Sequence, residues 1–352
     1  MIRERTLFVL GAGASAELDM PLGLDLIKLI SETALAVHGN KKHSRHLSLF
    51  KNLSVSFNDD REELNCLKDA AHFIYKHIYL ASSIDNFIEI HKDNEYIKHM
   101  GKFAIADSIL LKEQESSVYR NTQLSTGEVY FPKLSNSWYV QFFRLLFDGA
   151  TKNNIAEILE SLSFIIFNYD RIFEYLLLRS LIQTFGFNYE ESWEIVDRLD
   201  IIHPFGTVGK IPKLEGKQYQ DDFVGFGVTV ESGLNVFKAS QRIKTYGERL
   251  DSNFISTQIT PLIDKCETLI FLGSAFHRQN LDILYLSNSK NPKQIYSTGA
   301  DVYPQQVDNL SKRIMKNFLQ REPVEKYLSR IIVEPESRCK DFFHKHWRNF
   351  SQ

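Results

Sequence analysis

The first apolar run of the chain, Thr6 to Leu10, ends directly in the glycine turn Gly11-Ala12-Gly13. A short, continuous apolar run that is closed by glycine predicts a buried strand. Glycines at such a turn let a ligand approach the backbone closely, and the free N–H groups of a following helix favour an anion. This one feature therefore predicts an α/β fold in which the first strand leads into a phosphate-binding turn.

Further apolar runs of this kind recur only after about residue 161. Strands are predicted at Leu162–Phe167, Asp200–Ile202, Thr268–Leu272 and Gln294–Ser297, with an edge strand in the sequence RIIVE. Helical patterns separate these runs, the clearest over Asp170–Phe185. Alternating strands and helices favour a parallel sheet with helices on both faces. The predicted fold class is thus α/β, a Rossmann-like sheet with an added helical insertion module.

The helical insertion suggests a domain organisation. Residues 1–53 and 161–303 are expected to form the two parts of the Rossmann-like domain. Residues 54–160 form the helical insertion, and residues 304–352 a mainly helical tail that includes the edge strand. Helices are expected at residues 15–37, with a break near Met20-Pro21, and in two pieces over residues 231–256. Ser82 or Ser83 is placed to cap a helix that contains Phe87.

Net charge, apolar run length and cysteine spacing limit the classes of function that the sequence predicts. The formal net charge of −2 gives no overall attraction to nucleic acid or to a membrane surface. No apolar run approaches the ~20 residues of a membrane span. The three cysteines are far apart and form no CxxC pair, which argues against a structural zinc site and against disulfides. The sequence predicts a cytoplasmic protein without a metal.

Polar or glycine residues follow three more of the predicted strands. Asn168 and Asp170 come after the strand at residues 162–167, His203 ends the strand at residues 200–202, and Gly273-Ser274 follow the strand at residues 268–272. In open parallel sheets, ligands bind beyond the carboxyl ends of the strands. Each feature also has a structural interpretation, because Asn168 and Asp170 could serve only as a turn and a helix cap.

The glycine turn also satisfies the G-x-G-x-x-A fingerprint of nicotinamide dehydrogenases, from Gly11 to Ala16. That fingerprint expects a second strand ending in an acidic residue about 20 residues further on. The sequence ALAVHGNKKHSRHL in that region has neither. The dehydrogenase interpretation is therefore disfavoured.

Taken in order, the motifs GAGAS, MPLG, FNYD, HPFG and LGSAF resemble those of the sirtuin-like family. The resemblance covers about residues 6–30 and 161–300. The two zinc-holding CxxC pairs of sirtuin deacetylases are missing. In this respect, and in the sequence SSIDNFIEIHKDNEY, the chain looks like the bacterial sirtuin-like effectors that hydrolyse NAD+ in antiphage defence.

The resemblance implies roles for individual residues. Asn168 would position a water beside the nicotinamide ribose, and His203 would contact the ribose hydroxyls as a base or as a hydrogen-bond partner. Asp170 would bind the nicotinamide end or orient its loop. The cofactor-binding residues implied by the motifs are Gly11, Ala12, Gly13, Ser15, Pro21, Gly273 and Ser274.

The function implied is that of an NAD+ glycohydrolase, which releases nicotinamide and ADP-ribose and depletes cellular NAD+ during abortive infection. NAD+ is then the substrate, and no metal is needed. Two alternatives stay open: an NAD-dependent deacylase that lacks the zinc module, and a regulatory module that senses NAD+ or ADP-ribose. The family also implies partners, either further copies in a homo-oligomer or a HerA-type ATPase or other defence sensor protein.

Overall fold

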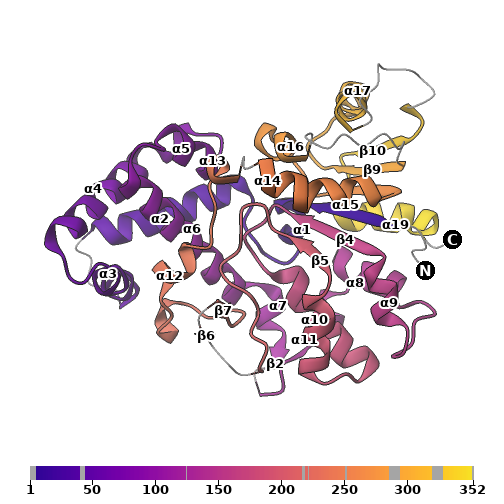
Figure 1. Ribbon diagram of the computed structural model, residues 1–352, viewed down its shortest axis with the longest axis horizontal. Coiled ribbons are helices and arrows are strands. Elements are labelled where there is room, and N and C mark those ends of the chain that lie inside the picture. Colours follow the sequence, from indigo (N-terminus) through magenta and orange to yellow (C-terminus); the bar gives the residue numbers. More distant parts are fainter. Residues whose placement is uncertain are drawn as a thin grey trace.

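The computed structural model describes residues 5–39, 44–123, 125–215, 219–220, 222–249, 252–284, 294–318 and 328–350. Its main feature is a six-stranded parallel sheet in the order β10-β9-β8-β1-β4-β5 (Figure 1). The strands are β1 (Thr6–Leu10), β4 (Leu162–Ile166), β5 (Asp200–Ile202), β8 (Thr268–Leu272), β9 (Gln294–Gly299) and β10 (Ile331–Pro335). This confirms the predicted Rossmann-like α/β fold.

The sheet is covered on both faces, as its apolar strands require. All five residues of β1 are buried. On one face, Phe8 of β1 stacks on Phe164 of β4 and meets Phe142 of helix α8 (Trp138–Phe147) edge-on. The helices α10 (Ile172–Phe185) and α19 (Cys339–Phe350) pack against α8 on the same face. These aromatic contacts fix α8, which the sequence places in the insertion, directly on the sheet.

The helical module is built on the packing of three helices, α2 (Gly23–His38), α4 (Arg61–His77) and α6 (Glu95–Glu115). Figure 1 shows it at the opposite end of the molecule from α19. Helix α3 (Ser44–Ser56) packs on α2 and crosses the predicted limit between residues 53 and 54. The cap predicted at Ser82 or Ser83 is at Ser83, which accepts the Asn86 N–H at the start of α5 (Ile84–Ile90). The domain limits stay a prediction.

The remaining helices are shorter or lie elsewhere along the chain. They are α1 (Ala12–Ala16), α7 (Ser117–Arg120), α9 (Ile155–Glu160), α11 (Tyr189–Asp197), α12 (Val236–Ser240), α13 (Tyr246–Arg249), α14 (Ser252–Phe254), α15 (Thr260–Lys265), α16 (Arg278–Leu284) and α17 (Val307–Phe318). Two short antiparallel pairs complete the fold, β2 (Thr122–Gln123) with β3 (Glu128–Val129) and β6 (Tyr219–Gln220) with β7 (Phe223–Val224).

Three details of the predicted elements were wrong. The described residues between 231 and 256 form several short helical segments rather than two helices, because Gly233 ends the first segment in the left-handed conformation and Asn235 caps the next. The insertion contains the β2–β3 hairpin, whose turn uses Gly127 at a φ of 67°. Helix α10 begins at Ile172, two residues later than predicted, and Asp170 accepts the Ile172 N–H from outside the helix at 3.2 Å.

Glu17 holds the segment after β1 in place. Its Oε2 accepts the Trp138 N–H at 2.8 Å and its Oε1 accepts the Lys340 N–H at 2.9 Å. One carboxylate thus caps the first turns of both α8 and α19, where backbone N–H groups lack helical partners. Trp138 returns a bond from its indole Nε1 to the Ala14 carbonyl at 2.7 Å. Helix α1 is therefore tied to two helices on one face of the sheet.

Candidate functional site

The glycine turn after β1 packs directly against the end of β8. The Gly11 N–H donates to the Leu272 carbonyl at 2.9 Å, and the Gly13 N–H donates to the Gly273 carbonyl at 3.1 Å. A Cβ added at Gly273 would lie 2.1 Å from the Ala14 nitrogen, and Gly273 has a φ of 61°. A Cβ at Gly11 would come within 2.5 Å of the Gly273 oxygen. The close approach of two backbones therefore requires these glycines.

Ser15, on α1, joins two residues that follow β4. Its Oγ donates to Asp170 Oδ1 at 3.0 Å and accepts from Asn168 Nδ2 at 3.1 Å. The Tyr139 hydroxyl of α8 lies 3.2 Å from the same Oγ. Because a serine hydroxyl has one proton to donate, Tyr139 is the donor in that contact. Ser15 thereby makes one donated and two accepted bonds, and the three side chains around it are fixed at the carboxyl edge of the sheet.

The carboxyl group of Asp170 is buried, and the carboxylates of Glu113 and Glu174 are near enough to act on it. Burial raises the pKa of its carboxyl group to about 7; the Ile172 N–H opposes this rise, whereas the negative charges of Glu113 and Glu174 add to it. A carboxyl group with that pKa exchanges its proton near neutral pH. Perturbed titrating groups of this kind cluster at functional sites, although buried networks also produce them.

His203, at the end of β5, completes the group. Its Nδ1 lies 2.9 Å from the Asn168 carbonyl oxygen, and its Nε2 lies 2.8 Å from Glu174 Oε1 on α10. Burial alone would lower the pKa of His203. The Glu174 carboxylate, the Asn168 carbonyl and the Asp170 charge outweigh burial, and together they raise that pKa above its ordinary value.

The side chains of residues 168–171, the segment after β4, bond to two different parts of the fold. Asn168 and Asp170 bind Ser15, whereas Tyr169 bonds Asp85 of α5 through its hydroxyl. Arg171 forms a fully buried ion pair with Glu113 of α6. Helices α5 and α6 therefore bind the same four-residue segment, 168–171, that carries the candidate site residues Asn168 and Asp170.

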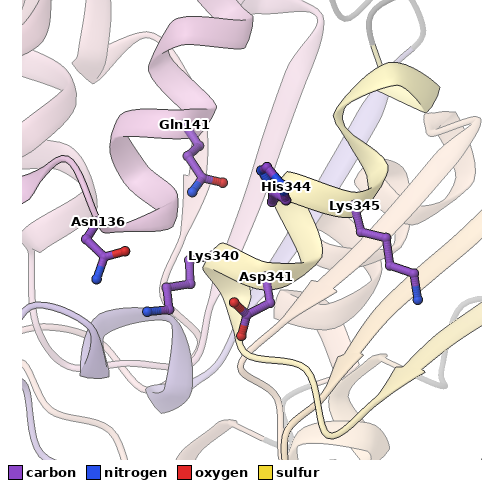
Figure 2. Close-up of a pocket in the computed structure, with 6 residues that line it drawn as sticks. All are labelled: Asn136, Gln141, Lys340, Asp341, His344 and Lys345. Atoms are coloured by element: carbon purple, nitrogen blue, oxygen red, sulfur yellow. The ribbon is translucent and has the colours of Figure 1, made fainter.

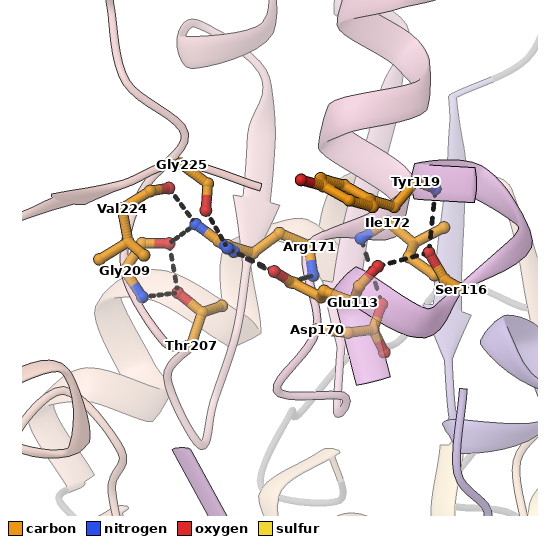
Figure 3. A network of polar contacts seen from close by, with 10 residues as sticks. All are labelled: Glu113, Ser116, Tyr119, Asp170, Arg171, Ile172, Thr207, Gly209, Val224 and Gly225. Carbon is orange, nitrogen blue, oxygen red and sulfur yellow. Dashed lines mark hydrogen bonds and ion pairs between the residues drawn. The ribbon is translucent and has the colours of Figure 1, made fainter. Parts of the chain in front are cut away.

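Figure 3 shows how far the Arg171 contacts extend. Its main-chain N–H and its Nε donate to Glu113 Oε1 at 3.1 and 3.0 Å. The guanidinium also donates to the Val224 carbonyl and, at 3.3 Å, to the carbonyls of Gly209 and Gly225. One side chain thus holds α6 and two stretches of the loop after β5 around the site.

A cavity of about 240 Å³ is lined in part by His203, whereas Ser15, Asn168 and Asp170 are not among its lining residues. His203, Glu174 and Thr207 supply polar groups to its wall, and α11 contributes Trp193 and Val196. A second cavity, of about 480 Å³, lies between α8 and α19 (Figure 2). It is lined by polar and charged side chains, namely Asn136, Gln141, Lys340, Asp341, His344 and Lys345.

The structure brings most of the sequence-predicted site residues together. Hydrogen bonds join Ser15, Asn168, Asp170 and His203. Backbone contacts join the residues of the two glycine turns, Gly11, Gly13, Gly273 and Ser274. Ala12 is exposed and Pro21 is half-buried in the segment between α1 and α2, so both lie outside the hydrogen-bonded group. The roles assigned to these residues stay predictions.

Sequence reasoning missed several partners of these residues. Glu174 lies four positions after Asp170, so helical spacing could have pointed to it. Tyr139 lies 124 positions from Ser15 and Glu113 lies 58 positions from Arg171. At such separations no local pattern in a single sequence links the partners.

Comparisons with models of known protein families, with curated proteins and with solved structures found no match. Within the described residues, no group of three or more His, Cys, Asp or Glu side chains is arranged to hold a metal ion. None of the described helices has the length and apolar composition that a membrane span needs. The class of protein therefore has to be argued from the site.

Proposed function

We propose that the protein is an NAD+ glycohydrolase that releases nicotinamide and ADP-ribose. The observation that carries the proposal is the hydrogen-bonded group of Ser15, Asn168, Asp170 and His203. It lies where β1, β4 and β5 end, which is where ligands bind in open parallel sheets. The motifs GAGAS, FNYD and HPFG, which carry the sirtuin-like resemblance, supply all four residues.

The reaction breaks the C–N bond between the ribose and nicotinamide, and nicotinamide leaves as a neutral molecule with the electron pair of that bond. Water adds to the ribose carbon, and one of its protons is released to the solvent. The sugar passes through an oxocarbenium-like state, so the site must place a water and stabilise positive charge. Ser15 fixes the amide nitrogen of Asn168. In the proposed reaction, the amide oxygen of Asn168 orients the water. Asp170 offers a carboxyl group that changes protonation near neutral pH.

The wider biological role rests on the resemblance alone. It is depletion of cellular NAD+ in bacterial antiphage defence by a cytoplasmic enzyme. Assembly as a homo-oligomer and activation by a HerA-type ATPase or another sensor protein are likewise proposed on the resemblance alone.

The function is tested by incubating the purified protein with NAD+ and quantifying nicotinamide and ADP-ribose. Turnover with NAD+ alone supports the glycohydrolase. Turnover only in the presence of an acylated peptide would instead identify a deacylase. Binding of NAD+ or ADP-ribose without turnover would identify a sensor.

Replacing Asn168 or His203 with alanine is expected to lower NAD+ hydrolysis by ~10²–10⁴-fold, the usual cost of losing a group that positions or transfers a proton. Asn136→Ala and His344→Ala are matched controls, because both residues are exposed and line the other cavity. Circular dichroism would verify folding of every variant. A folded Asn168→Ala or His203→Ala protein with near wild-type turnover would remove that residue from the mechanism.

A further inference from the structure

The hydrogen-bond partners of His203 determine where its protons lie. The Asn168 carbonyl oxygen, 2.9 Å from Nδ1, can only accept, so Nδ1 carries a proton. Glu174 Oε1, 2.8 Å from Nε2, accepts when the carboxyl group is ionised, so Nε2 then carries a proton as well. With Glu174 ionised, both ring nitrogens are therefore donors, and neither is available to accept a proton.

The surrounding charges favour this arrangement. Glu174, on α10, and Asp170, before α10, are the acidic groups that act on His203. The cations nearby are already paired: Arg171 with Glu113 of α6, and Lys210 with Asp197 of α11 at 3.2 Å. Glu174 Oε2 is buried and has no hydrogen-bond partner among the described residues. The positive charge in hydrogen-bond contact with this half-buried carboxylate is therefore the imidazolium.

We propose that Glu174 is a positioning residue that holds His203 as a doubly protonated imidazolium, so that His203 donates hydrogen bonds in the site and is not its proton acceptor. The Nδ1 proton then fixes the Asn168 carbonyl, and with it the turn that presents Asn168 and Asp170. The consequence for catalysis rests on the proposed NAD+ hydrolysis, whereas the protonation state itself does not.

The test is ¹⁵N nuclear magnetic resonance of the histidine rings as a function of pH, with the His203 signals assigned from their loss in His203→Gln. In the wild-type protein, both His203 nitrogens are expected to be protonated at pH 7. Glu174→Gln keeps the shape of the side chain and removes its charge. The midpoint of the His203 titration should then fall by about one pH unit or more, since a neighbouring opposite charge shifts a pKa by ~1–3 units.

Asp197→Asn is the matched control, because Asp197 lines the same cavity without bonding His203. It should leave the titration midpoint nearly unchanged. An unprotonated Nε2 at pH 7 in the wild-type protein would overturn the proposal, as would an unchanged midpoint in Glu174→Gln. If Glu174→Gln fails to fold, the ¹⁵N signals of the wild-type protein still show whether His203 Nε2 is protonated at pH 7, and that result alone tests the proposal.

Activity and NMR measurements on the same samples distinguish the proposed NAD+ hydrolysis from the proposed role of Glu174. A protein that does not hydrolyse NAD+ but shows an imidazolium at His203 would contradict only the proposed function. An active enzyme with a neutral His203 would contradict only the role of Glu174. In an active enzyme, Glu174→Gln should move the pH profile of kcat in step with the His203 titration, which a purely structural role would not do.

Discussion

Asp170 shows how one buried carboxyl group can make stability depend on pH. It accepts hydrogen bonds from Ser15 and from the Ile172 N–H, but burial and the nearby Glu113 and Glu174 carboxylates disfavour its charged form. The folded protein retains the Asp170 proton up to a pKa of about 7, whereas the unfolded chain loses it near pH ~4. Between these values the folded state binds more protons, so raising the pH favours unfolding.

We therefore expect Asp170→Asn to become progressively more stable relative to wild type as the pH rises from about 4 to about 7. The difference should grow by up to about 1.4 kcal/mol per pH unit and then level off. Urea denaturation of both proteins at several pH values from 5 to 8 measures it. Asp200→Asn, at an exposed position, is the control. A difference that does not vary with pH would show that Asp170 titrates normally.

At the scale of elements, Glu17 connects three helices through one side chain. Glu17→Ala removes the acceptor for the first turns of both α8 and α19. Loss of one helix cap typically costs ~0.5–2 kcal/mol, so we expect the free energy of unfolding to fall by about 1–4 kcal/mol. Glu17→Gln keeps one acceptor oxygen and should fall between alanine and wild type.

Chemical denaturation of the two variants measures the effect, with Glu32→Ala on the exposed side of α2 as the control. If Glu17→Ala were as stable as Glu32→Ala, water would be replacing the carboxylate at both helix ends.

The elements that the sequence predicts well are those with a strong local pattern. The apolar runs of β1, β4 and β8 were located to within one residue, because each ends in glycine or asparagine directly after the strand. The region around Gly233 and Asn235 was misread, because its short turns depend on single residues rather than on a repeating pattern. For the site, the sequence pointed to strand ends, and strand order then placed Asn168 and His203 side by side.

At the scale of the whole molecule, the ion pair of Glu113 and Arg171 joins the helical module to the sheet. Both side chains are buried, so removing one leaves the other charge without a partner. Glu113→Ala is expected to lower the free energy of unfolding by ~3–5 kcal/mol. The neighbouring Lys112→Ala is the control, since Lys112 pairs with Glu115 in an exposed contact.

Guanidinium denaturation measures both variants, and hydrogen exchange of the segment 168–171 reports on the site itself. We expect faster exchange there in Glu113→Ala, because the Arg171 N–H donates to the Glu113 carboxylate. Unchanged exchange, together with unchanged stability, would mean that the helical module does not support the site.

The place of β1 in the sheet has a consequence for how the protein is made. Thr6 pairs with Leu162 of β4 on one side and with Thr268 of β8 on the other. On the ribosome, the apolar TLFVL segment is thus synthesised long before either neighbour exists, and unpaired apolar strands are prone to aggregate. Helices α2, α4 and α6 can pack early from nearby sequence. The second neighbour, β8, is complete only after more than three-quarters of the chain has been synthesised, so the nascent protein has to be shielded until then.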